Sequence, residues 1–155
     1  MNGLSDILAI GSVDAALAAP NKRAVFQQLA FAMARQTGHD AKAIHEALSE
    51  REKLGSTGFG GGVAIPHGKL DGLGRVVGYF ARLTSPIDFQ SVDGLPVDLV
   101  FLLLSPPDAG ADHLKALAGV SRLLRDRDMV AKLRGARSDD AIFALLSGVE
   151  ALNAA

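Results

Sequence analysis

The sequence predicts a single α/β domain, a sandwich in which a mixed β-sheet is flanked by α-helices on both faces. Two observations predict this class. Helical patterns occupy both ends of the chain with strand-like segments between them, and one of those segments, 97–104, is apolar on both faces. Such a strand needs a covering layer above and below it. The chain has 155 residues, so we expect one domain over 1–155 with a core of about residues 4–148.

The N-terminal third predicts two helices, over 22–36 and 41–53. In both, apolar residues recur at spacings of three and four, which places them on one face of a helix. The segment before them, 7–17, is short and apolar and fits either a strand or a loop. Capping residues precede the helices and glycines follow them: Asn21 and Gly38 for the first, Asp40 and Gly55 for the second.

The middle of the chain predicts two strands, over 75–83 and 97–104. The pair Asp93-Gly94 marks a turn between them, and Ser105-Pro106-Pro107 ends the second strand abruptly. Since 97–104 is apolar on both faces, we expect it to lie in the middle of the sheet.

Helical spacing returns in the C-terminal third. Apolar residues over 112–125 follow the helical period, and 129–133 continues the pattern. Ser138 can cap a final helix that runs through Leu146. The order of elements is thus helices, strands and helices, which lets the sheet be covered on both faces.

Composition and charge exclude several classes of function. Sixteen basic and seventeen acidic residues give a net charge of −1, so the basic surface of a nucleic-acid-binding protein is missing and we expect no such partner. The absence of cysteine excludes disulfides, zinc–thiolate sites and a catalytic thiol. Neither a signal peptide nor a membrane-spanning segment is apparent. We therefore expect a cytoplasmic protein whose contact with membranes is peripheral at most.

The glycine-rich segment 55–68 is the most informative part of the sequence. It holds six glycines and one histidine, His67, and a loop of this kind can bring several backbone N–H groups to an anion. Pro66 fixes its own φ and biases Ile65 toward an extended backbone, so the ring of His67 is presented from a restrained position. In a neutral imidazole one nitrogen is free to attack. The segment predicts a histidine that carries a phosphoryl group.

A nucleotide and a zinc ion are the two alternative ligands for this segment. No Gly-Lys-Ser/Thr follows the glycines, and 58–63 imitates a dinucleotide fingerprint only in part, because a helix and not a strand precedes it. Zinc could be held by His67, His113 and a carboxylate such as Asp71, but their spacing matches no metal motif. We therefore expect no nucleotide, no other cofactor and no metal.

Three further histidines and one arginine are considered for this site. His113 lies near the start of a helix that follows a strand, where ligands often bind, and a surface role is equally open. Arg51 lies on the last turn of a helix and could reach a phosphate on His67, although its mixed charge run favours a solvated side chain. For His39 and His45 we expect solvated surface positions.

Taken together, these motifs resemble one known family. The residues that carry the resemblance are Arg51–Gly58, Gly60, Gly62–Leu70, Pro86–Phe89, Asp93–Val97, Val100–Leu104 and Asp112–Leu114. Over most of the chain the sequence resembles the enzyme IIA family of the bacterial phosphotransferase system, of the fructose/mannitol type and specifically its nitrogen-regulatory branch. The family's fold, a mixed sheet flanked by helices, agrees with the fold predicted above. In one departure, many nitrogen-type members carry asparagine where this chain has Gly61.

The resemblance implies a site and a reaction. It makes His67 the phosphoacceptor, His113 the second active-site histidine that hydrogen-bonds the phosphoryl oxygens, and Arg51 a source of positive charge. A phosphate loop is expected to assist, formed by Ser56, Thr57, Gly60, Gly61 and Gly62. The implied donor is the phosphohistidine of a small histidine phosphocarrier protein, and the chain is a phosphotransferase component that needs neither ATP nor metal.

Three alternatives remain for the role of the phosphorylated protein. The nitrogen-regulatory resemblance implies a regulator whose two forms bind different proteins, such as potassium transporters, sensor kinases or alarmone enzymes. A sugar-specific component would instead pass the phosphoryl group to a separate permease module, and a relic would bind partners without being phosphorylated. The sequence shows neither a second module nor a membrane segment, which favours the regulator.

Overall fold

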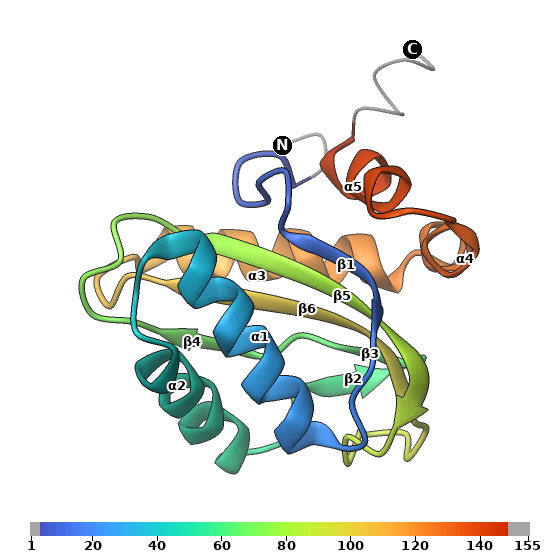
Figure 1. The fold of residues 1–155 in the computed structure, drawn as a ribbon, viewed down its shortest axis with the longest axis horizontal. Helices are drawn as coiled ribbons and strands as arrows, with labels where there is room; N and C mark the ends of the chain where they lie inside the picture. Colours follow the sequence, from blue (N-terminus) through green and yellow to red (C-terminus); the bar gives the residue numbers. More distant parts are fainter. Residues whose placement is uncertain (1–3, 149–155) are drawn as a thin grey trace.

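The computed structural model describes residues 4–148, and this part of the chain combines a six-stranded sheet with five helices (Figure 1). The strands are β1 (Val13–Leu17), β2 (Gly58–Gly60), β3 (Val63–Ala64), β4 (His67–Lys69), β5 (Val77–Ile87) and β6 (Val97–Ser105). The helices are α1 (Lys22–Thr37), α2 (Ala41–Lys53), α3 (Ala111–Arg125), α4 (Arg127–Gly135) and α5 (Asp139–Ser147). The α/β class with a mixed sheet is confirmed.

The helices form close to where the sequence predicts them, because their signals are local. The side chain of Asn21 accepts a hydrogen bond from the N–H of Ala24, as an N-cap does, and Asp40 caps α2 in the same way. Gly38 follows α1 with a φ of 78°, a conformation that glycine adopts without strain. Ser138 caps α5 as predicted.

The strands agree with the predictions less closely. The ambiguous segment 7–17 contains β1, and β5 ends at Ile87 and not at Leu83. Three strands that no sequence pattern predicts are β2, β3 and β4, which have two or three residues each. Strands this short form because neighbouring strands pair with them and not because of local propensity.

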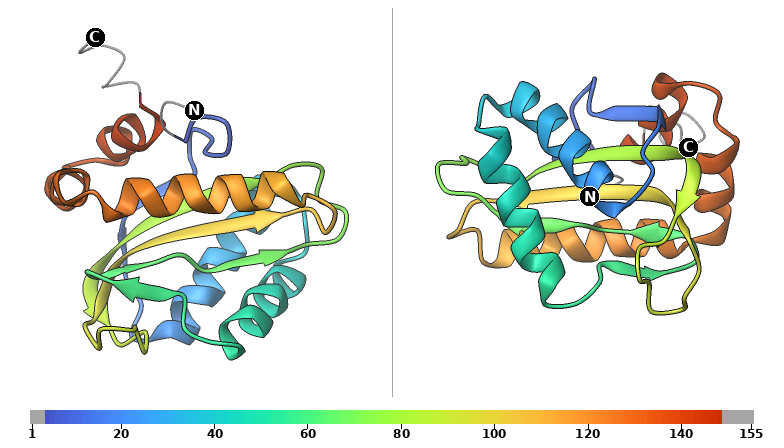
Figure 2. Two further views of the ribbon diagram at one scale, coloured as in Figure 1. Left: turned by 180° about the vertical axis from the view of Figure 1, so that it is seen from behind. Right: turned by 60° about the horizontal axis from the view of Figure 1, so that its bottom comes forward.

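β6 lies in the middle of the sheet, as predicted. The strand order is β1-β5-β6-β3-β2, and β4 also pairs with β6. β5 runs antiparallel to β6, whereas β3 and β4 run parallel to it. α1 and α2 cover one face of the sheet and α3 the other, as Figure 2 shows. The sheet thus holds β4 beside the end of β6, just before the chain enters α3.

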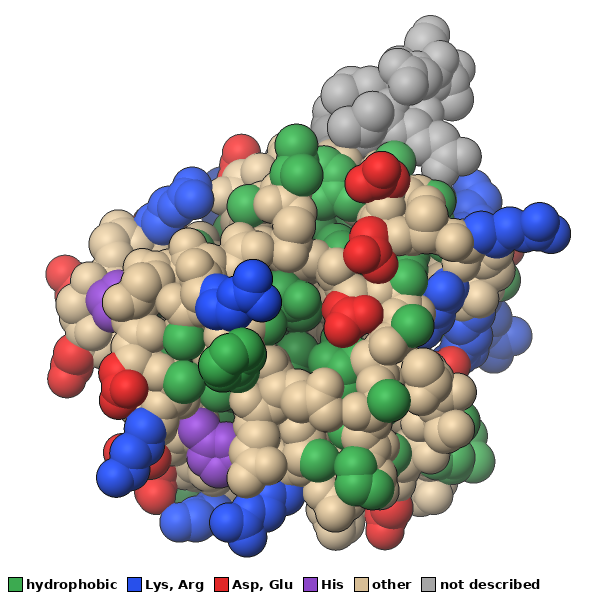
Figure 3. Space-filling model, viewed as in Figure 1, with side chains coloured by type: hydrophobic (Ala, Val, Ile, Leu, Met, Phe, Trp, Pro, Cys, Tyr) green, Lys and Arg blue, Asp and Glu red, His purple; other side chains and the backbone are tan. Residues whose placement is uncertain are grey.

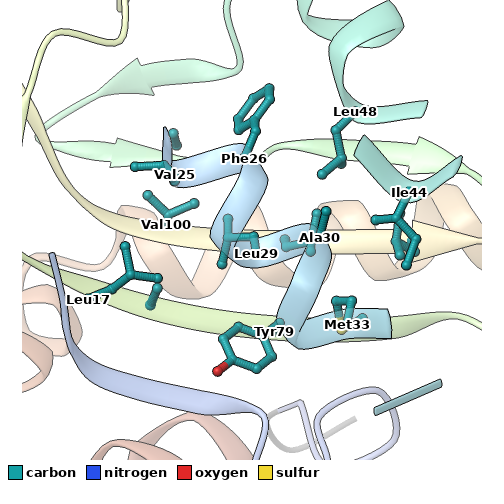
Figure 4. Close-up of a cluster of buried hydrophobic side chains, with 14 of the residues drawn as sticks. Leu17, Val25, Phe26, Leu29, Ala30, Met33, Ile44, Leu48, Tyr79 and Val100 are labelled. Carbon is teal, nitrogen blue, oxygen red and sulfur yellow. The ribbon is translucent and has the colours of Figure 1, made fainter. Parts of the chain in front are cut away.

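Two hydrophobic clusters join the layers. On one face Phe26 and Leu29 of α1 and Ile44 and Leu48 of α2 pack toward Val100 of β6 (Figure 4). On the other face α3, α4 and α5 pack against β6 and the N-terminal segment. Full burial of one leucine or phenylalanine side chain stabilises a fold by about 1.5–3 kcal/mol. The elements that carry the site are therefore held from both sides of the sheet.

Charged side chains of both signs are interspersed over the face that carries α1 and α2 (Figure 3). Interspersed charges give that face little net electrostatic field toward a partner. Among the helices within residues 4–148, none has both the length and the apolar character needed to cross a bilayer.

Candidate active site

His67 and His113 meet because of the way β4, β6 and α3 are connected. His67 begins β4, where it aligns with Leu103 near the end of β6. The chain leaves β6 at Ser105 and soon enters α3, so His113 on the first turn of that helix lies at the same end of the sheet. The centroids of the two imidazole rings are 5.8 Å apart. The structure thus brings together the two histidines that the sequence suggests for one site.

Arg51 reaches the same place from α2. A Cβ on Gly68 of β4 would lie 3.1 Å from the carbonyl oxygen of Ala47, so the glycine allows α2 to pack directly on β4. Arg51 lies one turn further along α2, and its Nε–H donates to Nε2 of His67 at 3.2 Å. Its Nη1 donates to the carbonyl oxygen of Gly55 at 2.9 Å. The guanidinium is therefore held between the loop and the histidine ring.

The hydrogen bonds of His67 define its tautomer. Nδ1 lies 2.8 Å from the carbonyl oxygen of Ile65, and since a carbonyl oxygen can only accept, Nδ1 carries the proton. Nε2 then holds the lone pair that accepts from Arg51. Burial is the main cause that lowers the pKa of His67 below its ordinary value, and the charge of Arg51 adds to this effect. The ring is therefore neutral at neutral pH, with its lone pair on Nε2.

Ser105 is a partner of His113 that is not predicted from the sequence. Its Oγ lies 2.6 Å from Nδ1 of His113, and the serine is completely buried at the end of β6. Burial, followed by the charges of His67 and Lys69, lowers the pKa of His113 as well. The available signal was a polar residue that directly continues the apolar run of β6.

The glycine turn, defined here as Gly60–Gly62, lies at the other end of β6. It links β2 to β3, and the carbonyl oxygen of Gly62 accepts from the N–H of Leu99, whereas His67 aligns with Leu103. Four residues of strand place these two positions about 13 Å apart. Gly60, Gly61 and Gly62 therefore lie away from the histidine ring, which corrects this part of the predicted phosphate loop.

Hydrogen bonds within the glycine turn explain its composition. Its three residues have φ values of 111°, 67° and 83°, which favour glycine. The N–H of Gly61 donates to Asp93 at 2.9 Å, and its carbonyl oxygen accepts from Nη2 of Arg134 at 2.9 Å. Arg134 also forms an ion pair with Asp98. The backbone of Gly61 is thus committed to the fold, and its φ suits the asparagine of many nitrogen-type members.

Ser56 and Thr57 also serve the loop itself. The hydroxyl of Ser56 donates to the carbonyl oxygen of Phe89 at 2.6 Å. Thr57 donates its N–H at 2.8 Å and its hydroxyl at 2.6 Å to the carboxylate of Glu52. Both residues fasten the segment after α2 to neighbouring elements, and their part in a phosphate loop stays a prediction.

The remaining histidines lie outside the site. His39 is partly buried in the turn between α1 and α2, near Gly72. His45 is partly buried too, and its Nε2 is enclosed without a hydrogen-bond partner among the described residues. The expectation of a solvated side chain is therefore wrong for His45. Within residues 4–148 no group of three histidine, aspartate or glutamate side chains gathers as metal ligands would, and the zinc site with Asp71 gains no support.

Comparison with known proteins identifies the family. The family model described as the phosphoenolpyruvate-dependent sugar phosphotransferase system, EIIA 2, matches residues 6–149. The chain belongs to this family. Its EIIA sequence is similar to a nitrogen regulatory protein of Bradyrhizobium diazoefficiens, with 53% identity over 144 residues that cover 93% of this chain and 94% of that protein. The nitrogen-regulatory branch suggested by the motifs is confirmed.

Two further relatives are a solved structure and a sugar-specific component. The crystal structure of nitrogen regulatory protein IIA-Ntr from Neisseria meningitidis has a TM-score of 0.87 at 32% identity, covering 92% of this chain and 97% of that chain. A fructose-specific EIIA component of the phosphotransferase system from Haloferax volcanii is 39% identical over 110 residues, which cover 71% of this chain and 71% of that protein. The EIIA fold is therefore the fold described above.

Proposed function

We propose that this protein accepts a phosphoryl group on Nε2 of His67 from a histidine phosphocarrier protein and regulates partners according to its phosphorylation state. The hydrogen bonding of His67 carries the proposal. Nδ1–H donates to the carbonyl oxygen of Ile65 at 2.8 Å, which leaves the lone pair on Nε2, in contact with Arg51 and beside the ring of His113. A neutral imidazole fixed in this way is an oriented nucleophile.

The transfer uses the two imidazoles and needs neither ATP nor metal. Nε2 of His67 attacks the phosphorus of the donor phosphohistidine; a new N–P bond forms while the old one breaks, and the electron pair of the old bond returns to the donor's ring nitrogen. The Nδ1 proton stays on His67, hydrogen-bonded to Ile65. Because donor and product are both phosphoimidazoles, the step is close to thermoneutral and reversible. The protein contributes positioning and charge.

Arg51 and His113 supply the stabilising groups. The Nε–H of Arg51 lies 3.2 Å from the atom that would receive the phosphoryl group. The guanidinium therefore has to leave that lone pair during transfer, and it can then bind the phosphoryl oxygens with charge-assisted hydrogen bonds. The ring of His113, 5.8 Å from that of His67 between centroids, is close enough to donate to another phosphoryl oxygen.

The rim of the site suits a protein donor. Leu54, which follows α2, is 84% exposed, and Leu114 beside His113 is 66% exposed. Apolar side chains of this kind form the buried centre of protein interfaces. The donor would then dock with its phosphohistidine over His67.

Phosphorylation would change this surface enough to act as a signal. It adds about −1.5 to −2 charges at neutral pH, while the whole chain carries a net charge of −1. Partners that distinguish the two forms would read this local change. The candidate classes of partner are potassium transporters, sensor kinases and alarmone enzymes, which the protein would meet in the cytoplasm.

A sugar-specific EIIA component is the second candidate function. The 39% identity to a fructose-specific component supports it, while the 53% identity to a nitrogen regulatory protein favours the regulator. The two differ in the fate of the phosphoryl group. If the phosphorylated protein quickly passes its label to the cysteine or histidine of an added permease module, it is a sugar component; if the label stays, the regulator is supported.

Labelling with phosphoenolpyruvate and the general phosphotransferase proteins tests the proposal. We expect the intact mass to increase by one phosphoryl group in the wild type and not in His67→Ala, whose circular dichroism should match that of the wild type. His39→Ala is the matched control and should be labelled as fast as the wild type. Retained labelling in His67→Ala, or a wild type that no carrier labels, would sink the proposal.

A further inference from the structure

The end of β6 carries a buried polar contact that the transfer step does not use directly. Ser105 is 0% exposed, and its Oγ has one hydrogen-bond partner within the described part of the chain, Nδ1 of His113 at 2.6 Å. The backbone carbonyl oxygen of Ser105 accepts separately from the N–H of Leu70. The hydroxyl is therefore available to the histidine alone.

The direction of this hydrogen bond follows from the groups that each side chain offers. A serine hydroxyl has one hydrogen to donate and two lone pairs, and a neutral imidazole has one donor and one acceptor nitrogen. If Nδ1–H of His113 donated to Ser105, the hydroxyl hydrogen would be buried without an acceptor, which is unfavourable. If the hydroxyl donates to Nδ1, that hydrogen is satisfied, and the ring proton of His113 resides on Nε2.

We propose that Ser105 is a positioning residue that holds His113 in the tautomer with its proton on Nε2, so that an N–H is ready for the phosphoryl group on His67. The inference rests on the proposed function, because this N–H matters to catalysis only if His67 is phosphorylated. The ring of His113 is 5.8 Å from that of His67 between centroids, and Nε2 is the nitrogen that Ser105 does not occupy. A donor fixed before the reaction needs no reorganisation as charge develops.

The two histidines then have opposite tautomers, each set by a group that takes no part in the chemistry. The carbonyl oxygen of Ile65 can only accept, so it places the proton of His67 on Nδ1. The hydroxyl of Ser105 can donate, so it places the proton of His113 on Nε2. One imidazole keeps a lone pair for attack, and the other keeps an N–H for a phosphoryl oxygen.

Ser105→Ala tests the inference, since alanine removes only the hydroxyl. We expect the initial rate of transfer from the phosphorylated carrier to fall about 3- to 10-fold, the effect of one hydrogen bond. In a His113→Ala background the same substitution should leave the remaining rate unchanged, because Ser105 acts through His113. An equal loss in both backgrounds would reduce Ser105 to a general structural role and overturn the proposal, as would an unchanged rate in the wild-type background.

The ring-nitrogen NMR signals of the unphosphorylated wild type give a readout that does not depend on transfer. Above the pKa of His113 we expect a protonated Nε2 and an unprotonated Nδ1 in that ring, and the reverse pattern in His67. A protonated Nδ1 in His113 would overturn the inference even if His67 is labelled normally. If the tautomers are as expected but no carrier labels His67, the proposed function fails, and with it the role of Ser105 in transfer.

Discussion

An arginine contacts a loop near each end of β6, and the two arginines have different roles. At the glycine end, Arg134 makes hydrogen bonds of 2.8 Å and 2.9 Å to Asp98 and one of 2.9 Å to Gly61. At the histidine end, Arg51 makes a longer contact of 3.2 Å to Nε2 of His67. The first arginine is committed to holding a turn. The second rests on a lone pair from which a phosphoryl group could displace it.

This difference indicates where an anion can bind. A glycine-rich loop offers N–H groups to a ligand only if those groups lack partners within the protein. In the glycine turn, the N–H of Gly61 is already bonded to Asp93. At the histidine end, the guanidinium of Arg51 contacts Nε2 of His67, a partner that it can exchange for a phosphoryl oxygen, and Nε2 of His113 is the ring nitrogen that Ser105 does not occupy. The glycines therefore indicate how the loop folds, whereas donors with exchangeable partners indicate where an anion can bind.

Among the substitutions that test this comparison, His113→Ala should have the largest effect, which is on the rate of transfer. Removal of one donor to charge that develops in a transition state slows reactions about 100-fold or more. Transfer to His67 should slow by about this factor, although labelling still reaches completion because the acceptor is intact. A time course with labelled phosphocarrier measures the rate. An unchanged rate in His113→Ala would contradict the assignment of the site to this end of β6.

Gly62→Ala should have the next largest effect, on stability instead of transfer. A Cβ there would overlap Nη2 of Arg134 and lie 3.0 Å from Asp98, and the φ of Gly62 is 83°. Left-handed strain and disturbance of this ion pair should lower the free energy of unfolding by about 2–3 kcal/mol. Urea denaturation measures this change, and the folded variant should transfer phosphoryl groups at the wild-type rate.

Gly135→Ala is the matched control for this substitution. No atom lies within 4 Å of a Cβ at Gly135, which ends α4, so its free energy of unfolding should stay close to the wild-type value. If both alanine variants unfold at the same urea concentration, the glycine turn does not hold the fold in the way described. Slower transfer by folded Gly62→Ala would show that the glycine turn contributes to the active site.

The smallest effect depends on pH and belongs to the histidine end. The pKa values of His67 and His113 are lowered, chiefly by burial. Below about pH 6.5 the unfolded chain binds protons that the folded protein does not. The free energy of unfolding therefore decreases as the pH is lowered through this range and increases as the pH is raised. Urea midpoints between about pH 5.5 and 7.5 should show this trend, with a shallower slope in His113→Gln. An identical slope in that variant would remove His113 from the explanation.

The helices and β6 could be predicted because their signals lie within a few residues of each other. Asn21 and Asp40 accept the capping hydrogen bonds that their positions suggest. β3, with two residues, has too little sequence to show a pattern and takes its conformation from pairing with β6. The glycine turn is assigned wrongly from sequence because loops that bind anions and loops that only reverse the chain share the same composition.

His67 could be singled out from sequence because Pro66 and the glycines surround it. His113 and Arg51 stay open at that level, since a surface role fits each of them equally well or better. Their meeting depends on the close approach of α2 to Gly68 and on the path from β6 into α3. Ser105 gives the weakest sequence signal, a serine at the end of an apolar strand.

The sequence by itself determined the α/β class, the capped helices, the central strand and the choice of His67, because each follows from residues that are close together in the chain. Only the tertiary structure decided that Nε2 of His67 holds the lone pair, that Arg51, His113 and Ser105 share its site, and that the glycine turn does not. The physical reason is that a tautomer is set by the hydrogen-bond partners of the ring. Except for the carbonyl group of Ile65, those partners lie on other secondary-structure elements, Arg51 on α2 and Ser105 on β6, and they meet the rings only when the sheet and its helices are packed.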